Sequence, residues 1–280
     1  MIEILEAIEN IAKGIENKVF SNYDDFAISG KSLEDTNNDI NKFCASLISD
    51  EFKKVSDIKS IIGQDTKEYT QINDSGKYIV SYIAIDNINL LDLNFSLGTI
   101  FAIYENTIDG ANLVASSYVT YGPTFQLVFA TKDKGVQFLS YDGESFKEQD
   151  SFTLEQKGKI NSTGGDVPSF NESHKQLMQS FFDIGYRLRF SNSLALDTHQ
   201  ILFKRGGLYS SPSTSKDPNG TLDLAFEAYP ISFIIELAGG VSIDGKNRIL
   251  DIKLEDDISK KTPIYFGSKN ELEKVKNSFN

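Results

Sequence analysis

The chain has 280 residues, of which 40% are hydrophobic and 24% are charged, a composition typical of globular proteins with a substantial core. The 28 lysines and arginines against 40 aspartates and glutamates give a formal net charge of −12, which disfavours general binding to nucleic acid or to an anionic membrane surface. The single cysteine, Cys44, excludes an internal disulfide and a cysteine-rich zinc site. We expect it to be a small buried hydrophobic side chain.

Two features bear on where the protein resides. Glu3 and Glu6 interrupt the apolar run that a secretory signal peptide would need at this end of the chain. The most apolar stretch, residues 231–238, contains Glu236 and is far shorter than a membrane span. We therefore expect a cytoplasmic protein with no membrane partner.

The first third of the chain is predicted to be helical and then to change to strands. Apolar residues from Ile4 to Val19 recur at three- and four-residue steps, which predicts an amphipathic helix, and a second helix is predicted over residues 39–55. After Lys77, β-branched and aromatic runs separated by turn signals predict a meander of antiparallel or mixed strands. These strands are predicted over residues 78–85, 97–104, 113–121, 125–130 and 136–141.

The second half of the chain alternates helices with short strands. Helices are predicted over residues 172–184, 193–203 and 224–238 and from residue 270, with strands over 248–252 and 264–267. Strands grouped first and helices alternating later indicate α/β layers in two lobes. We place the boundary near residues 155–165, which divides the chain into an N-terminal lobe, residues 1–158, and a C-terminal lobe, residues 159–280.

Charged side chains provide two candidate sites and two plain alternatives. Acidic residues cluster near predicted strand ends and could ligate a hard cation such as Mg²⁺, or could be solvated surface carboxylates. They are Asp65, Asp86, Asp92 and Glu227. Basic residues in the second lobe could bind a phosphorylated ligand, or could be scattered surface charge. They are Arg187, Arg189, Lys204, Arg205 and Lys216.

Other familiar chemistries find no support in the sequence. His174 and His199 have no matching serine or cysteine elbow, so a hydrolytic triad is not indicated, and both are expected to be exposed helix residues. No GxxxxGK[ST] phosphate loop and no dinucleotide fingerprint occurs.

Three longer segments resemble class 1 fructose-1,6-bisphosphatases. They are LDLNFSLGTIFAIY at residues 91–104, PNGTLDLAFE at 218–227, and the run from Ala-Gly-Gly at 238–240 to DGKNRILDI at 244–252. The resemblance implies a layered αβαβα fold of the sugar-phosphatase type. It also implies Mg²⁺- or Mn²⁺-dependent hydrolysis of the 1-phosphate of fructose 1,6-bisphosphate, as in gluconeogenesis, and a homo-oligomer, commonly a tetramer.

The family's metal-binding positions are only partly retained. Asp65, Asp86 and Glu227 match acidic ligands, and Asp35, aligned less securely, matches an upstream acid. The resemblance therefore assigns metal binding to Asp65, Asp86 and Glu227, and catalysis to Asp35, Asp65 and Asp86. Two further ligand positions have lost their carboxylates, because they hold Gln64 and Ile83. We expect metal binding to be weakened.

The substrate-binding positions are also altered. Asn161 and Arg189 match retained residues that contact the sugar phosphate in the family. Phe190 and Ser211 stand where the family has tyrosines, and Thr221 stands where it has a lysine. Three readings stay open at this point. The protein is a working fructose-1,6-bisphosphatase or related sugar phosphatase, or a catalytically silent paralogue that binds a sugar phosphate or nucleotide or regulates an active subunit, or a structural or interaction protein that has kept only the fold.

Overall fold

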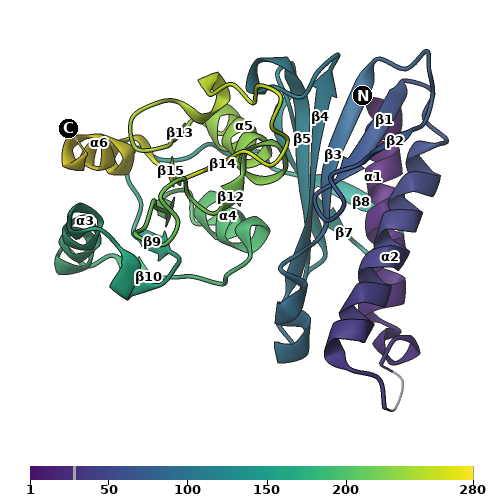
Figure 1. The fold of residues 1–280 in the computed structure, drawn as a ribbon, viewed down its shortest axis with the longest axis horizontal. Coiled ribbons are helices and arrows are strands. Elements are labelled where there is room, and N and C mark those ends of the chain that lie inside the picture. The colour runs from purple at the N-terminus through teal and green to yellow at the C-terminus, as the bar shows by residue number, and fades with distance from the viewer. Residues whose placement is uncertain (28–29, 280) are drawn as a thin grey trace.

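The structure is a computed structural model that describes residues 1–27 and 30–279. Helices and sheets alternate in five layers, αβαβα, and the order of the layers can be followed across Figure 1. The fold class predicted from the sequence is therefore confirmed. Within the described residues, no helix is both long enough and apolar enough to span a membrane.

The first layer consists of α1 (Ile2–Ile15) and α2 (Leu33–Phe52), which pack against each other and against one face of the large sheet. A π-helical turn at Glu16–Phe20 continues α1. Val19 in this turn is buried, so the predicted apolar face is confirmed over its whole length, from Ile4 to Val19. The helix predicted over residues 39–55 begins earlier, because Ser32 Oγ accepts a hydrogen bond from the Asp35 N–H and caps α2. Cys44 is fully buried, as predicted.

The large sheet has eight strands in the order β2-β1-β3-β4-β5-β6-β7-β8. Only the β1–β3 pair is parallel among these neighbours, so the predicted mixed meander is confirmed. All nine residues of β3 are buried, since helices cover both faces of the sheet. The strands are β1 (Ile58–Gly63), β2 (Tyr69–Gln71), β3 (Tyr78–Asp86), β4 (Leu97–Glu105), β5 (Leu113–Tyr121), β6 (Gln126–Thr131), β7 (Gly135–Tyr141) and β8 (Phe146–Gln149).

The third layer separates the two sheets and contains α4 (Leu194–Phe203) and α5 (Tyr229–Leu237), the latter preceded by a π-helical turn at Leu224–Ala228. The smaller sheet follows, in the order β10-β9-β11-β15-β13. Its strands are β9 (Ile160–Thr163), β10 (Arg187–Leu188), β11 (Leu208–Ser211), β13 (Val241–Ile243) and β15 (Ile264–Gly267). A separate ribbon pairs β12 (Leu222–Asp223) with β14 (Lys261–Thr262).

The fifth layer, α3 (Glu172–Asp183) and α6 (Lys269–Ser278), covers the outer face of the smaller sheet. Residue 158, where the sequence divided the lobes, lies in the connection between β8 and β9, and that division stays a prediction. The strand predicted over residues 248–252 is wrong, because a 3₁₀ turn occupies Ile249–Asp251. The expectation of exposed histidines is also wrong: His174 is fully buried and His199 is half-buried.

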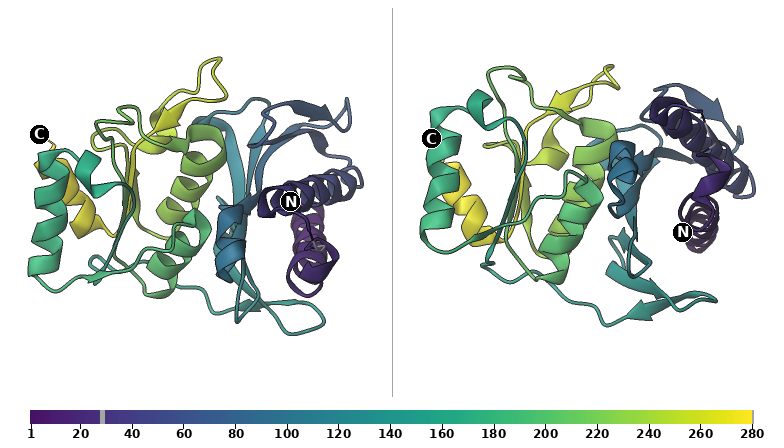
Figure 2. Two further views of the ribbon diagram at one scale, coloured as in Figure 1. Left: turned by 60° about the horizontal axis from the view of Figure 1, so that its bottom comes forward. Right: turned by 90° about the horizontal axis from the view of Figure 1, so that it is seen from below.

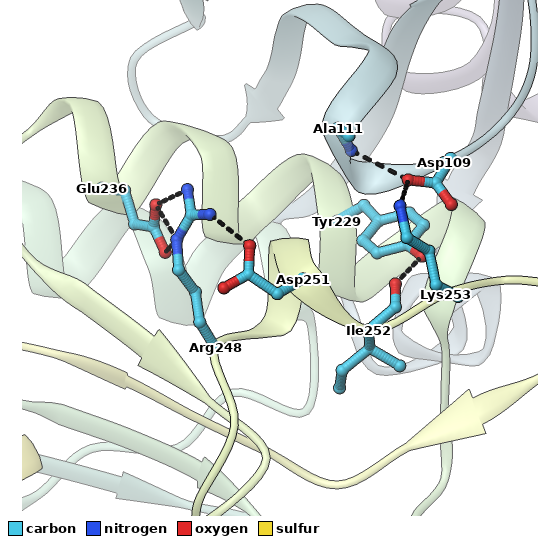
Figure 3. A network of polar contacts seen from close by, with 8 residues as sticks. All are labelled: Asp109, Ala111, Tyr229, Glu236, Arg248, Asp251, Ile252 and Lys253. Atoms are coloured by element: carbon cyan, nitrogen blue, oxygen red, sulfur yellow. Dashed lines mark hydrogen bonds and ion pairs between the residues drawn. The ribbon is translucent and has the colours of Figure 1, made fainter.

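Polar contacts join this 3₁₀ segment to the loop between β4 and β5 (Figure 3). Lys253 Nζ lies 3.1 Å from Asp109 Oδ1, and the buried Tyr229 hydroxyl donates to the carbonyl oxygen of Ile252 at 2.5 Å. Arg248 forms ion pairs with Glu236 and Asp251 nearby. Side-chain contacts with α5 and with the loop between β4 and β5 thus hold this segment in place, and hydropathy patterning does not report them.

Candidate active site

A cavity of about 440 Å³ opens between the two sheets, and segments from both halves of the chain line it. The end of β3, the loop after β9, the N-terminus of α4, the end of β11 with its following loop, and residues 221–227 all contribute. Such a concave site between layers of an α/β fold is a usual place for a small ligand.

Asp86 stands at the end of β3 and is 6% exposed. Its Oδ2 accepts hydrogen bonds from Ser193 Oγ at 2.7 Å and from the Ala195 N–H at 2.8 Å, so the carboxylate caps the N-terminus of α4. Burial raises the pKa of the Asp86 carboxyl, and these hydrogen bonds oppose the rise. Asn87 adds a hydrogen bond from its Nδ2 to the Asn192 carbonyl at 2.8 Å. Asp86 therefore works here as a structural link between β3 and α4.

Glu227 lines the same cavity and accepts a hydrogen bond from the Asp223 N–H at 2.6 Å. Burial raises the pKa of Glu227 to about 8, and the nearby carboxylates of Asp86 and Asp223 add to the rise. The Asp223 carboxylate accepts from Gln64 Nε2 at 3.0 Å and forms an ion pair with Lys67 Nζ at 3.1 Å. The Asp223 carboxylate is therefore already paired with a lysine ammonium, and neither side chain lines the cavity.

Lys67 and Asp223 are functional candidates that the sequence analysis missed. They are 156 positions apart and form a partly buried pair, and neither residue is part of the cavity lining. Each lies within two residues of a recognised stretch, since Lys67 follows Gln64-Asp65 closely and Asp223 belongs to the 218–227 segment. That proximity was the available signal, but their pairing is visible only in the fold.

Of the remaining predicted metal positions, Gln64 lines the cavity together with Asp86 and Glu227, whereas Asp65, Asp35 and Ile83 do not. Asp65 is exposed and is not part of the cavity lining, and Asp35 is exposed in the first turn of α2. Ile83 is 5% exposed and belongs to the buried hydrophobic cluster on the inner face of the large sheet. Across residues 1–27 and 30–279, no three histidine, cysteine, aspartate or glutamate side chains are placed to hold one metal ion. The residues present do not fit the metal centre that the resemblance implies.

Three of the predicted substrate-binding residues do meet at the cavity. Ser211 and Thr221 lie across from each other, with 3.1 Å between their hydroxyl oxygens. The Phe190 ring lies over Gly164, where an added Cβ would come within 2.4 Å of the ring, so this close approach requires glycine. These residues contribute an uncharged part of the cavity lining.

Asn161 and Arg189 lie elsewhere. Asn161 is fully buried in β9, where its Nδ2 points to the Met178 sulfur at 3.2 Å. Arg189 is exposed beside a separate groove of about 760 Å³. The cationic residues of that groove are Lys157, Lys159, Arg187, Arg189 and Lys204.

The basic set predicted from the sequence is therefore not gathered at one place. Arg187, Arg189 and Lys204 line the separate groove, whereas Lys216 lines the cavity and forms an ion pair with Asp166 at 2.5 Å. Arg205 lines neither depression, and its Nε lies 3.9 Å from Glu155 Oε1. Among the acidic residues, Asp92 is exposed in the 3₁₀ turn Ile88–Leu93 and does not join the cavity lining.

Comparisons with known proteins agree with the fold and with the resemblance found in the sequence. Residues 1–149 match the family described as fructose-1-6-bisphosphatase, N-terminal domain, and residues 154–280 match its C-terminal domain. The class 1 fructose-1,6-bisphosphatase of Campylobacter hominis is 40% identical over 280 residues, covering 98% of each chain. The protein of that name from Campylobacter jejuni subsp. jejuni serotype O:2 is 36% identical over the full length of both chains.

A solved structure gives the same architecture. The crystal structure described as a sedoheptulose-1,7 bisphosphatase from Toxoplasma gondii superposes with a TM-score of 0.85 and covers 99% of this chain and 93% of its own. Its sequence identity is 21%, so this comparison bears on the fold alone.

Proposed function

Because the chain belongs to the fructose-1,6-bisphosphatase family, we propose that it is a member of that family whose phosphatase activity is weak or lost. The observation that carries this proposal is that the carboxylates at or next to the cavity already have protein partners. Asp86 caps a helix, Glu227 accepts a hydrogen bond from the Asp223 N–H, and the Asp223 carboxylate forms an ion pair with Lys67.

The physical cost of this arrangement is large. Hydrolysis of a phosphate ester in metal-dependent enzymes relies on the metal to hold phosphoryl oxygens and to lower the pKa of the attacking water. Removing one such electrostatic group typically lowers the rate by about 10²–10³, and losses within one site are not additive. Gln64 and Ile83 each lack the negative charge of the acid that the family has there. We therefore expect turnover far below the usual range.

Other features of the proposed function come from the family. The ligand would be a sugar phosphate, any remaining activity would need Mg²⁺ or Mn²⁺, and the protein would act in the cytoplasm as a homo-oligomer, commonly a tetramer in this family. A catalytically silent regulatory paralogue is the alternative, and it shares the same expectation of weak or no turnover.

Phosphate release from fructose 1,6-bisphosphate at saturating Mg²⁺ or Mn²⁺ tests the proposal, with the Campylobacter hominis relative as the active reference. We expect turnover at least about 10³-fold below the reference, in view of the cost of each lost group. Turnover within the usual enzyme range of about 1–10³ s⁻¹ would overturn the proposal.

A reversion pair separates a lost metal site from a generally impaired protein. Ile83→Asp with Gln64→Glu returns two carboxylates, and we expect it to regain Mn²⁺ binding, measured by calorimetry, before it regains catalysis. Ile79→Asp with Gln64→Glu is the matched control, because Ile79 lies on the same strand and in the same buried cluster as Ile83. Equal Mn²⁺ binding by both double variants would mean that position 83 is not the lost ligand.

A further inference from the structure

Two loops that line the cavity are joined to each other and carry a cation between them. The loop after β9 contributes Asp166 and the loop after β11 contributes Lys216, and their side chains form an ion pair at 2.5 Å. The Ser215 N–H also donates to the Ser169 carbonyl oxygen at 2.9 Å. Among the described residues that line the cavity, Lys216 is the only lysine or arginine. A negatively charged group that enters the cavity therefore has one cationic side chain to bind.

A hydrogen-bonded turn sets the position of Lys216. Thr214 Oγ1 accepts from the Lys216 N–H at 3.2 Å and from the Asp217 N–H at 2.9 Å. The Thr214 N–H donates to the Asp217 carbonyl oxygen at 3.1 Å. These bonds hold the backbone at Lys216, in the manner of a side-chain-stabilised turn. The Lys216 side chain is 69% exposed, so its ammonium can reach a ligand without disturbing the packed core.

The segment from Ser211 to Thr221 also supplies hydroxyl protons for an anion. Two accepted N–H bonds fill the acceptor capacity of Thr214 Oγ1, so its own proton remains to be donated. Ser211 and Thr221 share one hydrogen bond, and whichever hydroxyl accepts it keeps a proton to donate. All three hydroxyl residues line the cavity together with Lys216. An ammonium combined with hydroxyl donors is a suitable set for phosphoryl oxygens.

Asp166 occupies the ammonium that such a group would need. The Lys216 and Asp166 side chains are 69% and 45% exposed, and an ion pair between exposed groups contributes little free energy because water solvates both partners. A phosphoryl group carries close to two negative charges at neutral pH, so it can displace the carboxylate. The exposed Asp217 also lines the cavity, and its charge is screened in the same way.

From these contacts we infer that Lys216 binds the phosphoryl group of the sugar phosphate, and that Asp166 lowers the affinity by competing with that group for the ammonium. The inference rests on the proposed function for the class of ligand, and it adds the residue that recognises the phosphoryl group. The sugar then meets the rest of the lining, where its hydroxyls can hydrogen-bond with the carboxyl groups of Asp86 and Glu227 and with the Tyr209 hydroxyl.

Calorimetry with D-fructose 6-phosphate on the full chain, without added metal, tests this inference. Amide shifts of Gly165 report whether the ligand enters the cavity, since Gly165 lines it. Lys216→Met should weaken binding about tenfold, the loss expected for one charge-assisted hydrogen bond. Lys216→Arg keeps the charge and should bind within about threefold of wild type. Asp166→Asn should tighten binding about threefold, because it removes the competing carboxylate.

A second exposed ion pair provides the matched control. Lys147 and Asp142 are 60% and 44% exposed, close to the values for Lys216 and Asp166, and neither lines the cavity. Lys147→Met and Asp142→Asn should each leave the affinity within about twofold of wild type. In the Lys216→Met background, Asp166→Asn should no longer tighten binding, because the competition requires the lysine.

Each outcome decides one part of the inference. Equal affinities of wild type and Lys216→Met would overturn the role of Lys216, as would the absence of saturable fructose 6-phosphate binding by the wild type. Equal tightening by Asp166→Asn with and without Lys216 would overturn the competition, because it would indicate general repulsion. None of these results bears on phosphate release, which tests the proposed function. Rapid release would refute the proposed loss of activity and leave this comparison valid, since an active enzyme would also bind a sugar phosphate.

Discussion

Replacing Asp197 with asparagine should make the stability of the protein less sensitive to pH. Asp197 lies in the first turn of α4 and is fully buried. Its Oδ1 accepts from the Ser191 N–H at 2.9 Å and from Gln200 Nε2 at 3.1 Å, while its Oδ2 has no hydrogen-bond partner among the described residues. Asparagine can keep the Oδ1 contacts and cannot ionise.

The size of the effect follows from the pKa of this carboxyl. Burial raises the pKa of Asp197 from 3.8 to about 7, although hydrogen bonds from Ser191 oppose the rise. A raised pKa favours the neutral form in the folded state, so the stabilisation is complete below the unfolded pKa and is lost as the pH rises through about 7. Ionisation in place should cost about 4 kcal/mol above that range, of which about 2 kcal/mol develops between about pH 5.5 and 8.5.

Urea unfolding of wild type and Asp197→Asn across that pH range measures the difference in free energy of unfolding. The difference should move in favour of the variant by about 2 kcal/mol from the acid to the alkaline end. Asp256→Asn, at an exposed site, should show no such trend. A difference between wild type and Asp197→Asn that stays constant with pH would refute the reasoning, because it would mean that Asp197 does not titrate in this range.

Two further predictions concern stability. For His174 the pH dependence of stability has the opposite sign to that of Asp197. Burial lowers the pKa of His174 to about 4, so the unfolded chain takes up a proton before the folded protein does as the pH falls below about 6.5. Wild type should therefore lose about 2 kcal/mol relative to His174→Phe between about pH 7.5 and 5 in urea unfolding, and an unchanged difference would contradict this. Tyr229→Phe removes the buried hydrogen bond to the Ile252 carbonyl and should cost about 1–2 kcal/mol, whereas Lys253→Ala breaks only the surface pair with Asp109 and should cost less than about 1 kcal/mol. Thermal unfolding compares these two variants, and an equal loss would mean that the contacts of Figure 3 do not differ in burial as described.

The elements of the fold were largely legible in the chain. The strand predicted over residues 113–121 is β5 without change, and the helix predicted over 172–184 differs from α3 by one residue. Apolar residues recur every three or four positions in a helix and every two in a strand with one buried face, because that face faces the core. Such a pattern can be read from a short stretch of sequence. The resemblance in residues 91–104 and 218–252 identified the family for the same reason, since a run of residues carries it.

The sequence also showed that Gln64 and Ile83 have no carboxylate, which is a matter of composition at a single position. What each retained acid does was decided only by the tertiary structure. Asp86 caps α4 through hydrogen bonds to residues 107 and 109 positions further along the chain. Asp65 lies outside the cavity, although it is the next residue after Gln64.

Whether side chains far apart in the sequence meet at one site depends on how whole helices and strands pack, and on which partners lie within reach of each side chain. Arg189 and Lys216 looked alike as basic residues of one lobe, yet the edge position of β10 and the loop after β11 send them to two different depressions. Lys67 and Asp223 form a pair that no local pattern could have indicated. The sequence by itself therefore determined the layers and the family, and the tertiary structure decided the charge of the cavity, because electrostatic interactions act over a few ångströms of space irrespective of separation along the chain.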